Sequence, residues 1–484
     1  MYNISAINNI KTYNIDNRSQ SLQASAAQNT AATSPVCAAA TDAAQTHIYA
    51  QPLKPSNHSY QSFKANQIRT TLTGKDEHQK YNDVAAVLDK KSRKDLNNLL
   101  KNGKLLSSNS NDNTTTLDNL YNIITKPGIL GIDRQKIAAD VIERISNPAV
   151  ITQKFGDVPL NMQSDIINKE KSDGKNISAM DLDVKSSTCP AASIEFNLAH
   201  KMPAEFARMA EALTSPAMSV TKKIDVNGLS QGLMNTIWML NEFGTEHKMQ
   251  DWNTLVVNLK PDKNAIIRAR IQNDYKDKDE RSVVDVLMQS TFMNVGAQNT
   301  YDTLIDRRVP KYNDDDSGLI DIEKNFAEEL ATGKGKVCVT YQKIDDNGKL
   351  AGYECEQQET LAHIQNTLNG GDNVIIGYTY CDADNNVIGG HEITIIGIET
   401  DKKGNKYFVC NDTDDGISDY IKYPVSDLLP KIHHAGIPKS VLVGNVEFIE
   451  GWKELMAFYR ETKQQQEVQN AIKNNRLTVL NQAA

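Results

Sequence analysis

Three segments of the sequence carry residue types that could together form a cysteine-dependent active site. Cys189 stands in the segment 186–193, which reads Ser-Ser-Thr-Cys-Pro-Ala-Ala-Ser, and His391 follows two glycines far downstream. Asp412 ends the next apolar segment. A thiol attacks a carbonyl only as the thiolate, and an ordinary cysteine is mostly protonated at neutral pH. A neighbouring histidine can accept the proton, and a carboxylate or amide can then orient the imidazole.

The residues around Cys189 predict that this cysteine begins a helix. Pro190 suits the first turn because its missing N–H would have no partner there, and Thr188 suits the N-cap position. The small residues at 191–193 would let the helix pack closely beneath a cleft. Unpaired N–H groups at a helix start favour negative charge, whether on a thiolate or on an oxyanion. A buried structural cysteine is the alternative interpretation.

His391 is expected at the start of one strand, and its orienting partner is expected at the end of the next. A turn at 402–405 would join two antiparallel strands and bring these two ends together. Successive strand residues face opposite ways, so only one of Asn411 and Asp412 can point at the histidine. We favour Asp412 and keep Asn411 as the other candidate. The alternatives are a surface histidine at a strand start and a polar turn after residue 410.

Composition and periodicity predict an α+β fold in which helices precede antiparallel strands. Apolar residues recur at helical spacing up to about residue 335, and alternation with turn signals follows. The expected divisions are a disordered leader (1–80), a small helical segment (81–150), a catalytic domain (151–449) with a helical part (151–335) and a β part (336–449), and a C-terminal helix and tail (450–484). The leader is rich in Asn, Ser, Ala, Thr and Gln and lacks clustered apolar residues.

Bulk properties disfavour several other classes of protein. The formal net charge is -8, which argues against nucleic acid as a ligand because phosphate binding needs a basic surface. No segment approaches the roughly 18 consecutive apolar residues of a membrane span. The six cysteines are too sparse for a disulfide scaffold, and the nine histidines lack metal-ligand spacing, so we expect neither a metal nor a cofactor. The start lacks a signal-peptide pattern, so a cytoplasmic location is the default and leaderless secretion stays possible.

The cysteine and histidine segments resemble papain-like cysteine peptidases, most closely the bacteriocin-processing branch. The residues 189–193 are similar to the nucleophile helix of that branch, and Gly390-His391 with the closing Asn411-Asp412 is similar to its histidine strand and orienting residue. The resemblance implies a papain-like fold, with the cysteine helix in a helical lobe and the histidine and aspartate in a β-sheet lobe. It also implies cleavage of peptide, isopeptide or other amide bonds in a peptide or protein substrate through a thioester.

Two features depart from the family pattern. The family places a glutamine about six residues before the cysteine to bind the oxyanion, and here Asp183 holds that position. The separation between Cys189 and His391 is also longer than is typical. Because the same fold hosts other chemistry, two alternatives stay open. They are a transglutaminase or deamidase that uses the same triad, and a catalytically inactive papain-like binding or effector module.

Overall fold

The computed structural model describes most of the chain between residues 68 and 442. The described stretches are 68–154, 188–275, 280–297, 321–345, 347–414 and 418–442, with the strand β1 (His47–Tyr49), residues 300–304, 306–308 and 318–319, and single positions such as Ser186. Most of the predicted leader, the predicted C-terminal helix and tail, and Asp183 lie outside the described residues.

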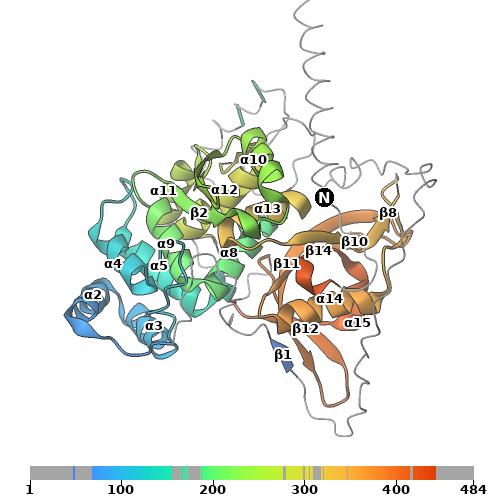
Figure 1. Cartoon of the computed structure of the whole chain (residues 1–484), viewed down its shortest axis with the longest axis horizontal. Coiled ribbons are helices and arrows are strands. Elements are labelled where there is room, and N and C mark those ends of the chain that lie inside the picture. Colours follow the sequence, from blue (N-terminus) through green and yellow to red (C-terminus); the bar gives the residue numbers. More distant parts are fainter. Residues whose placement is uncertain are drawn as a thin grey trace, which may run out of the picture.

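Helices form one side of the molecule and an antiparallel sheet forms the other (Figure 1). The expected α+β class is therefore confirmed. The helices of the first side are α2 (Gly74–Val87), α3 (Lys90–Lys101), α4 (Thr116–Thr125), α5 (Arg134–Ser146), α8 (Cys189–Lys201), α9 (Pro203–Leu213), α10 (Gly232–Glu242), α11 (Ala265–Tyr275), α12 (Val283–Gly296) and α13 (Asp321–Thr332). None of the described helices is long and apolar enough to cross a membrane.

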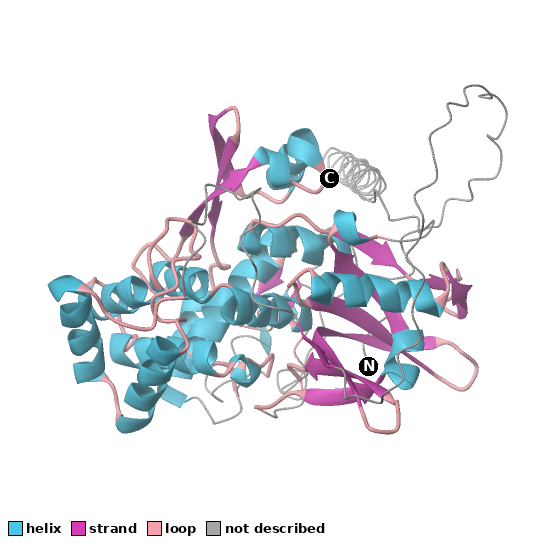
Figure 2. Cartoon of the chain, turned by 60° about the horizontal axis from the view of Figure 1, so that its bottom comes forward, coloured by secondary structure: helices cyan, strands magenta, loops and turns pink. Residues whose placement is uncertain are grey.

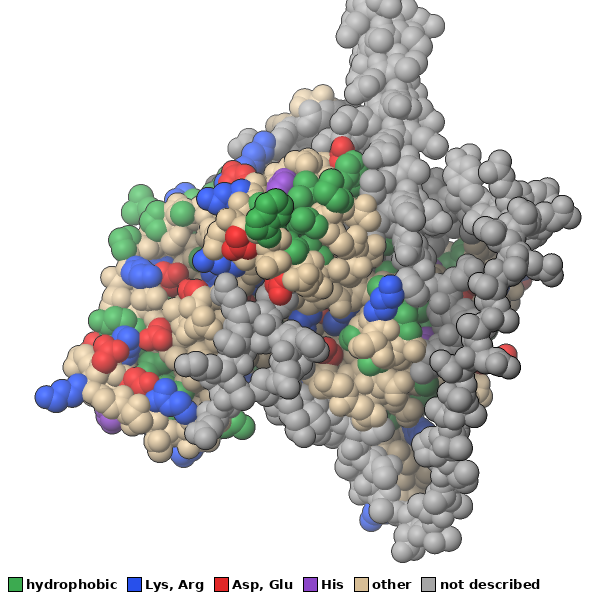
Figure 3. All heavy atoms as spheres, in the orientation of Figure 1, with side chains coloured by type: hydrophobic (Ala, Val, Ile, Leu, Met, Phe, Trp, Pro, Cys, Tyr) green, Lys and Arg blue, Asp and Glu red, His purple; other side chains and the backbone are tan. Residues whose placement is uncertain are grey.

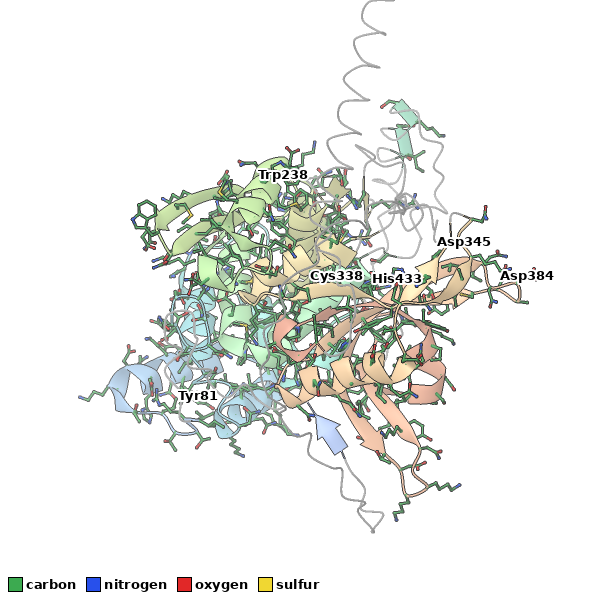
Figure 4. All side chains as sticks on the ribbon, turned by 45° about the vertical axis from the view of Figure 1, so that its right-hand side comes forward. Tyr81, Trp238, Cys338, Asp345, Asp384 and His433 are labelled. Carbon is green, nitrogen blue, oxygen red and sulfur yellow. The ribbon has the colours of Figure 1, made fainter. Side chains whose placement is uncertain are left out.

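The large sheet has the strand order β13-β12-β11-β10-β14-β7, and β1 pairs with the far end of β11. Its strands are β7 (Val337–Thr340), β10 (Val374–Cys381), β11 (Val387–Thr400), β12 (Lys406–Asn411), β13 (Ile421–Pro424) and β14 (Ile432–Ile437). The hairpin of β8 (Gln342–Ile344) and β9 (Leu350–Tyr353) extends from it. In Figure 4, Asp345 and Asp384 mark the turns at the outer tips of two hairpins.

Both faces of the sheet are buried, by different partners. Ile375, Ile396 and Val409 point to one face and belong to the same apolar core as the helices. Val374 and Ile376 point to the other face. There they pack with α14 (Gln357–Asn369) and α15 (Val425–Leu428). The helix that carries Cys189 and the strand that carries His391 therefore meet across a continuous hydrophobic core.

A second, three-stranded sheet lies in the region that the sequence predicts to be mostly helical. It consists of β2 (Val220–Asp225), β4 (Thr254–Leu259) and β3 (Glu246–Asp251) in that order. Figure 2 shows this three-stranded sheet, with the hairpin of β3 and β4, projecting beyond the helices. Trp252 in its turn is 93% exposed, and apolar side chains gather over the neighbouring α10, where Met234 is 76% exposed (Figure 3).

The small helical segment begins earlier than predicted and does not form a separate core. Helix α2 begins at Gly74, so the predicted boundary at residue 80 falls inside it. Buried residues of α4 and α5, such as Leu120 and Ile142, belong to the core that also contains Phe206 of α9. The Ile129 N–H donates to the Thr214 carbonyl at 3.0 Å, which joins this segment to the end of α9.

Candidate active site

Cys189 is the first residue of α8, and this helix packs against β11. The Ala192 N–H donates to the Thr188 carbonyl at 2.9 Å, which begins the helical hydrogen bonding. Pro190 occupies the first turn, where a missing N–H costs nothing. The cysteine is 8% exposed, so it is shielded from bulk solvent without being sealed. The N-terminal end of the helix thus places its partial positive charge beside the thiol.

The turn before Cys189 is held by buried hydroxyl groups. Thr188 stands at the N-cap position, as the sequence predicts, but its hydroxyl makes no capping hydrogen bond. Instead the Ser186 and Thr188 hydroxyl oxygens lie 2.6 Å apart, and both accept hydrogen bonds from the Arg281 guanidinium. The Thr188 hydroxyl also donates to Gln289 of α12 at 3.3 Å. Because these groups are buried and mutually bonded, they restrict the turn to one arrangement.

His391 and Asp412 come from the adjacent strands β11 and β12. The register pairs Thr394 with Asn411, so Asp412 follows the last residue of β12 and shares a face with His391. His391 Nε2 and Asp412 Oδ1 lie 2.8 Å apart, a normal distance for an N–H donating to a carboxylate. Asn411 points with Thr394 to the opposite face and is fully buried there. The structure therefore brings Asp412, and not Asn411, to the histidine.

The charges at this site support one another. Burial disfavours a charged imidazole, but the hydrogen bond from His391 to Asp412 and the interaction with the Cys189 side chain outweigh it and raise the pKa of His391 well above its usual value. Burial would raise the pKa of Asp412, yet its hydrogen bond with His391 lowers it overall. Since Nε2 is bonded to Asp412, Nδ1 is the ring nitrogen left to face the thiol. Cys189, His391 and Asp412 thus form one connected group.

Two tyrosines that the sequence does not single out complete the surroundings of the pair. The Tyr423 hydroxyl of β13 donates to Asp412 Oδ2 at 2.8 Å, so both carboxylate oxygens are engaged. The Tyr378 ring of β10 meets the His391 ring edge to face, with centroids 5.8 Å apart. Burial, and then the negative charge of Asp412, raises the pKa of Tyr423. The Tyr423 hydroxyl therefore keeps its proton and acts as a hydrogen-bond donor. Sequence alternation could place Tyr378 opposite His391 only once the strand pairing was known.

A second buried polar cluster lies on the opposite face of β11. Glu392 accepts from His434 Nε2 of β14 at 2.6 Å and lies 3.4 Å from Lys324 Nζ of α13. Burial disfavours the charged carboxylate, but Lys324 and His434 lower the pKa of Glu392 to about 2. Strand alternation separates this cluster from His391, so it does not belong to the candidate site.

Among the described residues, no group of His, Cys, Asp and Glu is arranged to hold a metal ion. The candidate site consists of the Cys189 thiol, the His391 imidazole and the Asp412 carboxylate. No protein-family model matches the chain, and neither a curated protein nor a solved structure matches it.

Proposed function

We propose that the chain is a papain-like cysteine-dependent hydrolase that cleaves peptide, isopeptide or related amide bonds in a peptide or protein substrate. The observation that carries this proposal is the connected group of Cys189, His391 and Asp412, in which His391 is bonded to a carboxylate and interacts with the thiol. A cysteine that served packing alone would need neither an imidazole nor an oriented carboxylate beside it.

The reaction proceeds in two steps. The Cys189 thiolate attacks the substrate carbonyl carbon, and the C–N bond breaks as His391 transfers its proton to the departing amine. Water then attacks the thioester while His391 accepts its proton, which releases the carboxylic acid and regenerates the thiol. Asp412 keeps the imidazole in the tautomer that faces the thiol and stabilises the imidazolium. We assign the oxyanion to the backbone N–H of Cys189, since the first N–H groups of a helix lack intrahelical partners.

Alkylation of Cys189 by iodoacetamide, followed by peptide mass spectrometry, tests this function. Cys381 is exposed and serves as an ordinary thiol in the same chain. At pH 6 we expect Cys189 to react at least about tenfold faster than Cys381, and to lose that advantage in His391→Ala. Equal rates for the two thiols in the wild type would contradict the proposal.

A peptide library then separates hydrolysis from binding alone. An acyl fragment on Cys189 that is trapped by acid quenching and absent from Cys189→Ala would support the thioester step. A reactive thiol that forms no such adduct and cleaves no peptide would instead favour a binding module.

A further inference from the structure

The candidate triad is assembled from two parts of the molecule, and one buried segment connects them. Cys189 belongs to the helical side, whereas His391 and Asp412 belong to the sheet. Thr152 and Gln153 lie between the two halves and are 7% and 1% exposed.

On the sheet side, this segment holds the residue that follows Asp412. The Gln153 N–H donates to the Thr413 carbonyl at 3.0 Å, and the Thr152 hydroxyl donates to the same carbonyl at 3.1 Å. The Thr413 hydroxyl donates back to Gln153 Oε1 at 3.3 Å. Thr413 is 1% exposed, so water cannot readily replace these hydrogen bonds. The backbone next to Asp412 is thereby tied to residues 152 and 153.

On the helical side, the two carbonyls of the same segment are both engaged. Arg281 donates through Nε and Nη2 to the Gln153 carbonyl, at 3.0 and 2.6 Å. Gln289 donates through Nε2 to the Thr152 carbonyl at 2.9 Å. Arg281 and Gln289 also contact the Thr188 hydroxyl just before Cys189.

Two parallel paths therefore run from the turn before the thiol to the loop that carries the carboxylate. One passes through Arg281 and the Gln153 carbonyl, and the other passes through Gln289 and the Thr152 carbonyl. Asp306 binds the Arg281 guanidinium at 2.7 Å, so this buried cation has a counter-charge. Hydrogen bonds between buried groups are costly to lose because the freed group has no water to turn to.

We propose that Thr152, Gln153, Arg281 and Thr413 are positioning residues that set the distance between the Cys189 thiol and the His391–Asp412 pair. This inference rests on the proposed thiol chemistry and adds the device that aligns its two halves. It predicts that loosening Thr413 alters His391 through Asp412, although none of the four residues contacts a reacting atom. A merely structural role would lower stability without changing the titration of His391.

Thr152→Val tests the proposal because it removes the hydroxyl and nearly keeps the side-chain shape. We expect alkylation of Cys189 at pH 6 to slow about threefold to tenfold, because the variant loses the buried hydrogen bond to the Thr413 carbonyl and also the acceptor of the Lys154 N–H. The pKa of His391, followed by NMR of its ring carbons, should fall because its carboxylate partner is held less firmly. Thr152→Ser keeps the hydroxyl and should restore both properties.

Thr367→Val is the matched control, since Thr367 is also buried and its hydroxyl donates to the His363 carbonyl at 2.8 Å within α14. This variant should lose comparable stability and leave alkylation and the His391 titration unchanged. The inference is overturned if Thr152→Val is less stable but matches the wild type in the His391 titration. Should wild-type Cys189 prove no more reactive than Cys381, the proposed function fails, and the His391 titration in Thr152→Val still decides this inference.

Discussion

At the scale of single residues, the same substitution is expected to be nearly neutral at one buried glutamate and strongly destabilising at another. Burial, and then the charge of Asp285, raises the pKa of Glu195 well above its usual value, so folding favours the neutral form of this side chain, which an amide resembles. Burial acts in the same direction on Glu205, but Lys222 and Arg208 outweigh it and lower the pKa of Glu205 to about 2. We expect Glu195→Gln to change the free energy of unfolding by less than about 1 kcal/mol, and Glu205→Gln to lower it by about 3–5 kcal/mol.

The Glu205 effect should also depend on pH. A carboxylate whose pKa is lowered on folding stabilises the protein fully above its unfolded pKa of about 4.5 and loses that contribution as the pH falls towards 2. Urea unfolding at pH 7, 4 and 3 would therefore show a difference between wild type and Glu205→Gln that shrinks with acid. A difference that stayed constant over this range would show that the Glu205 charge does not stabilise the fold.

Residue types and strand alternation predicted that Cys189, His391 and one of two adjacent residues, Asp412 or Asn411, lie close together. Cys189 followed by proline predicted a helix start, and alternation predicted that only one of Asn411 and Asp412 points at His391. The register of β11 and β12 selects Asp412. The sequence did not predict Arg281 or Tyr423 as neighbours of the site. Their contacts depend on tertiary packing between distant segments, and neither stands in a local pattern that marks such a role.

At the scale of elements, β10, β11 and β12 of the large sheet were predictable, whereas β2 was not. Turn residues separate β10, β11 and β12, and their apolar runs match buried strands. In β2 the residues that point inward include Lys222, whose ammonium group binds the Glu205 carboxylate at 2.6 Å. A buried lysine at an inward position hides the alternation of apolar and polar residues that marks a strand.

Gly377 on β10 shows how the packing of neighbouring strands constrains one position. It pairs with Glu392 on one side and His434 on the other. A Cβ at Gly377 would lie 2.6 Å from His434 Nε2 and 2.9 Å from Glu392 Oε1. We expect Gly377→Ala to lower the free energy of unfolding by about 1–3 kcal/mol, because the buried pair must move to admit a methyl group.

Urea unfolding would measure this effect, with Gly370→Ala as the control. Gly370 ends α14 with an ordinary φ of -70°, and a Cβ there would approach backbone oxygens no closer than 3.3 Å. If the two alanine variants unfolded at the same urea concentration, the Glu392–His434 pair would not restrict the Gly377 position.

At the scale of the whole molecule, the N-terminal helices and the sheet share a core, although the sequence predicted the helical segment 81–150 as a part of its own. Leu120 of α4 and Val409 of β12 belong to the same cluster of buried apolar residues. The ion pair between Arg144 of α5 and Asp285 of α12 further joins the N-terminal helices to the rest. Local sequence patterns report which face of an element is apolar and not which element covers that face, so the sharing of one core could not be foreseen.

A shared core predicts that damage in the N-terminal helices destabilises the distant sheet. Leu120 is fully buried, and Leu120→Ala should cost about 2–5 kcal/mol. Cys410 is fully buried on β12, and burial raises the pKa of its thiol, so it reacts only when the sheet opens. We expect Leu120→Ala to shift the labelling of Cys410 to lower urea concentrations. The free-energy change calculated from this shift should equal the change in the free energy of global unfolding.

The control is Leu130→Ala, the same change at a side chain that is 86% exposed, which should leave both the labelling and the unfolding transitions in place. Labelling of Cys410 that ignored Leu120→Ala while the helices unfolded earlier would mean that the two sides of the molecule unfold independently.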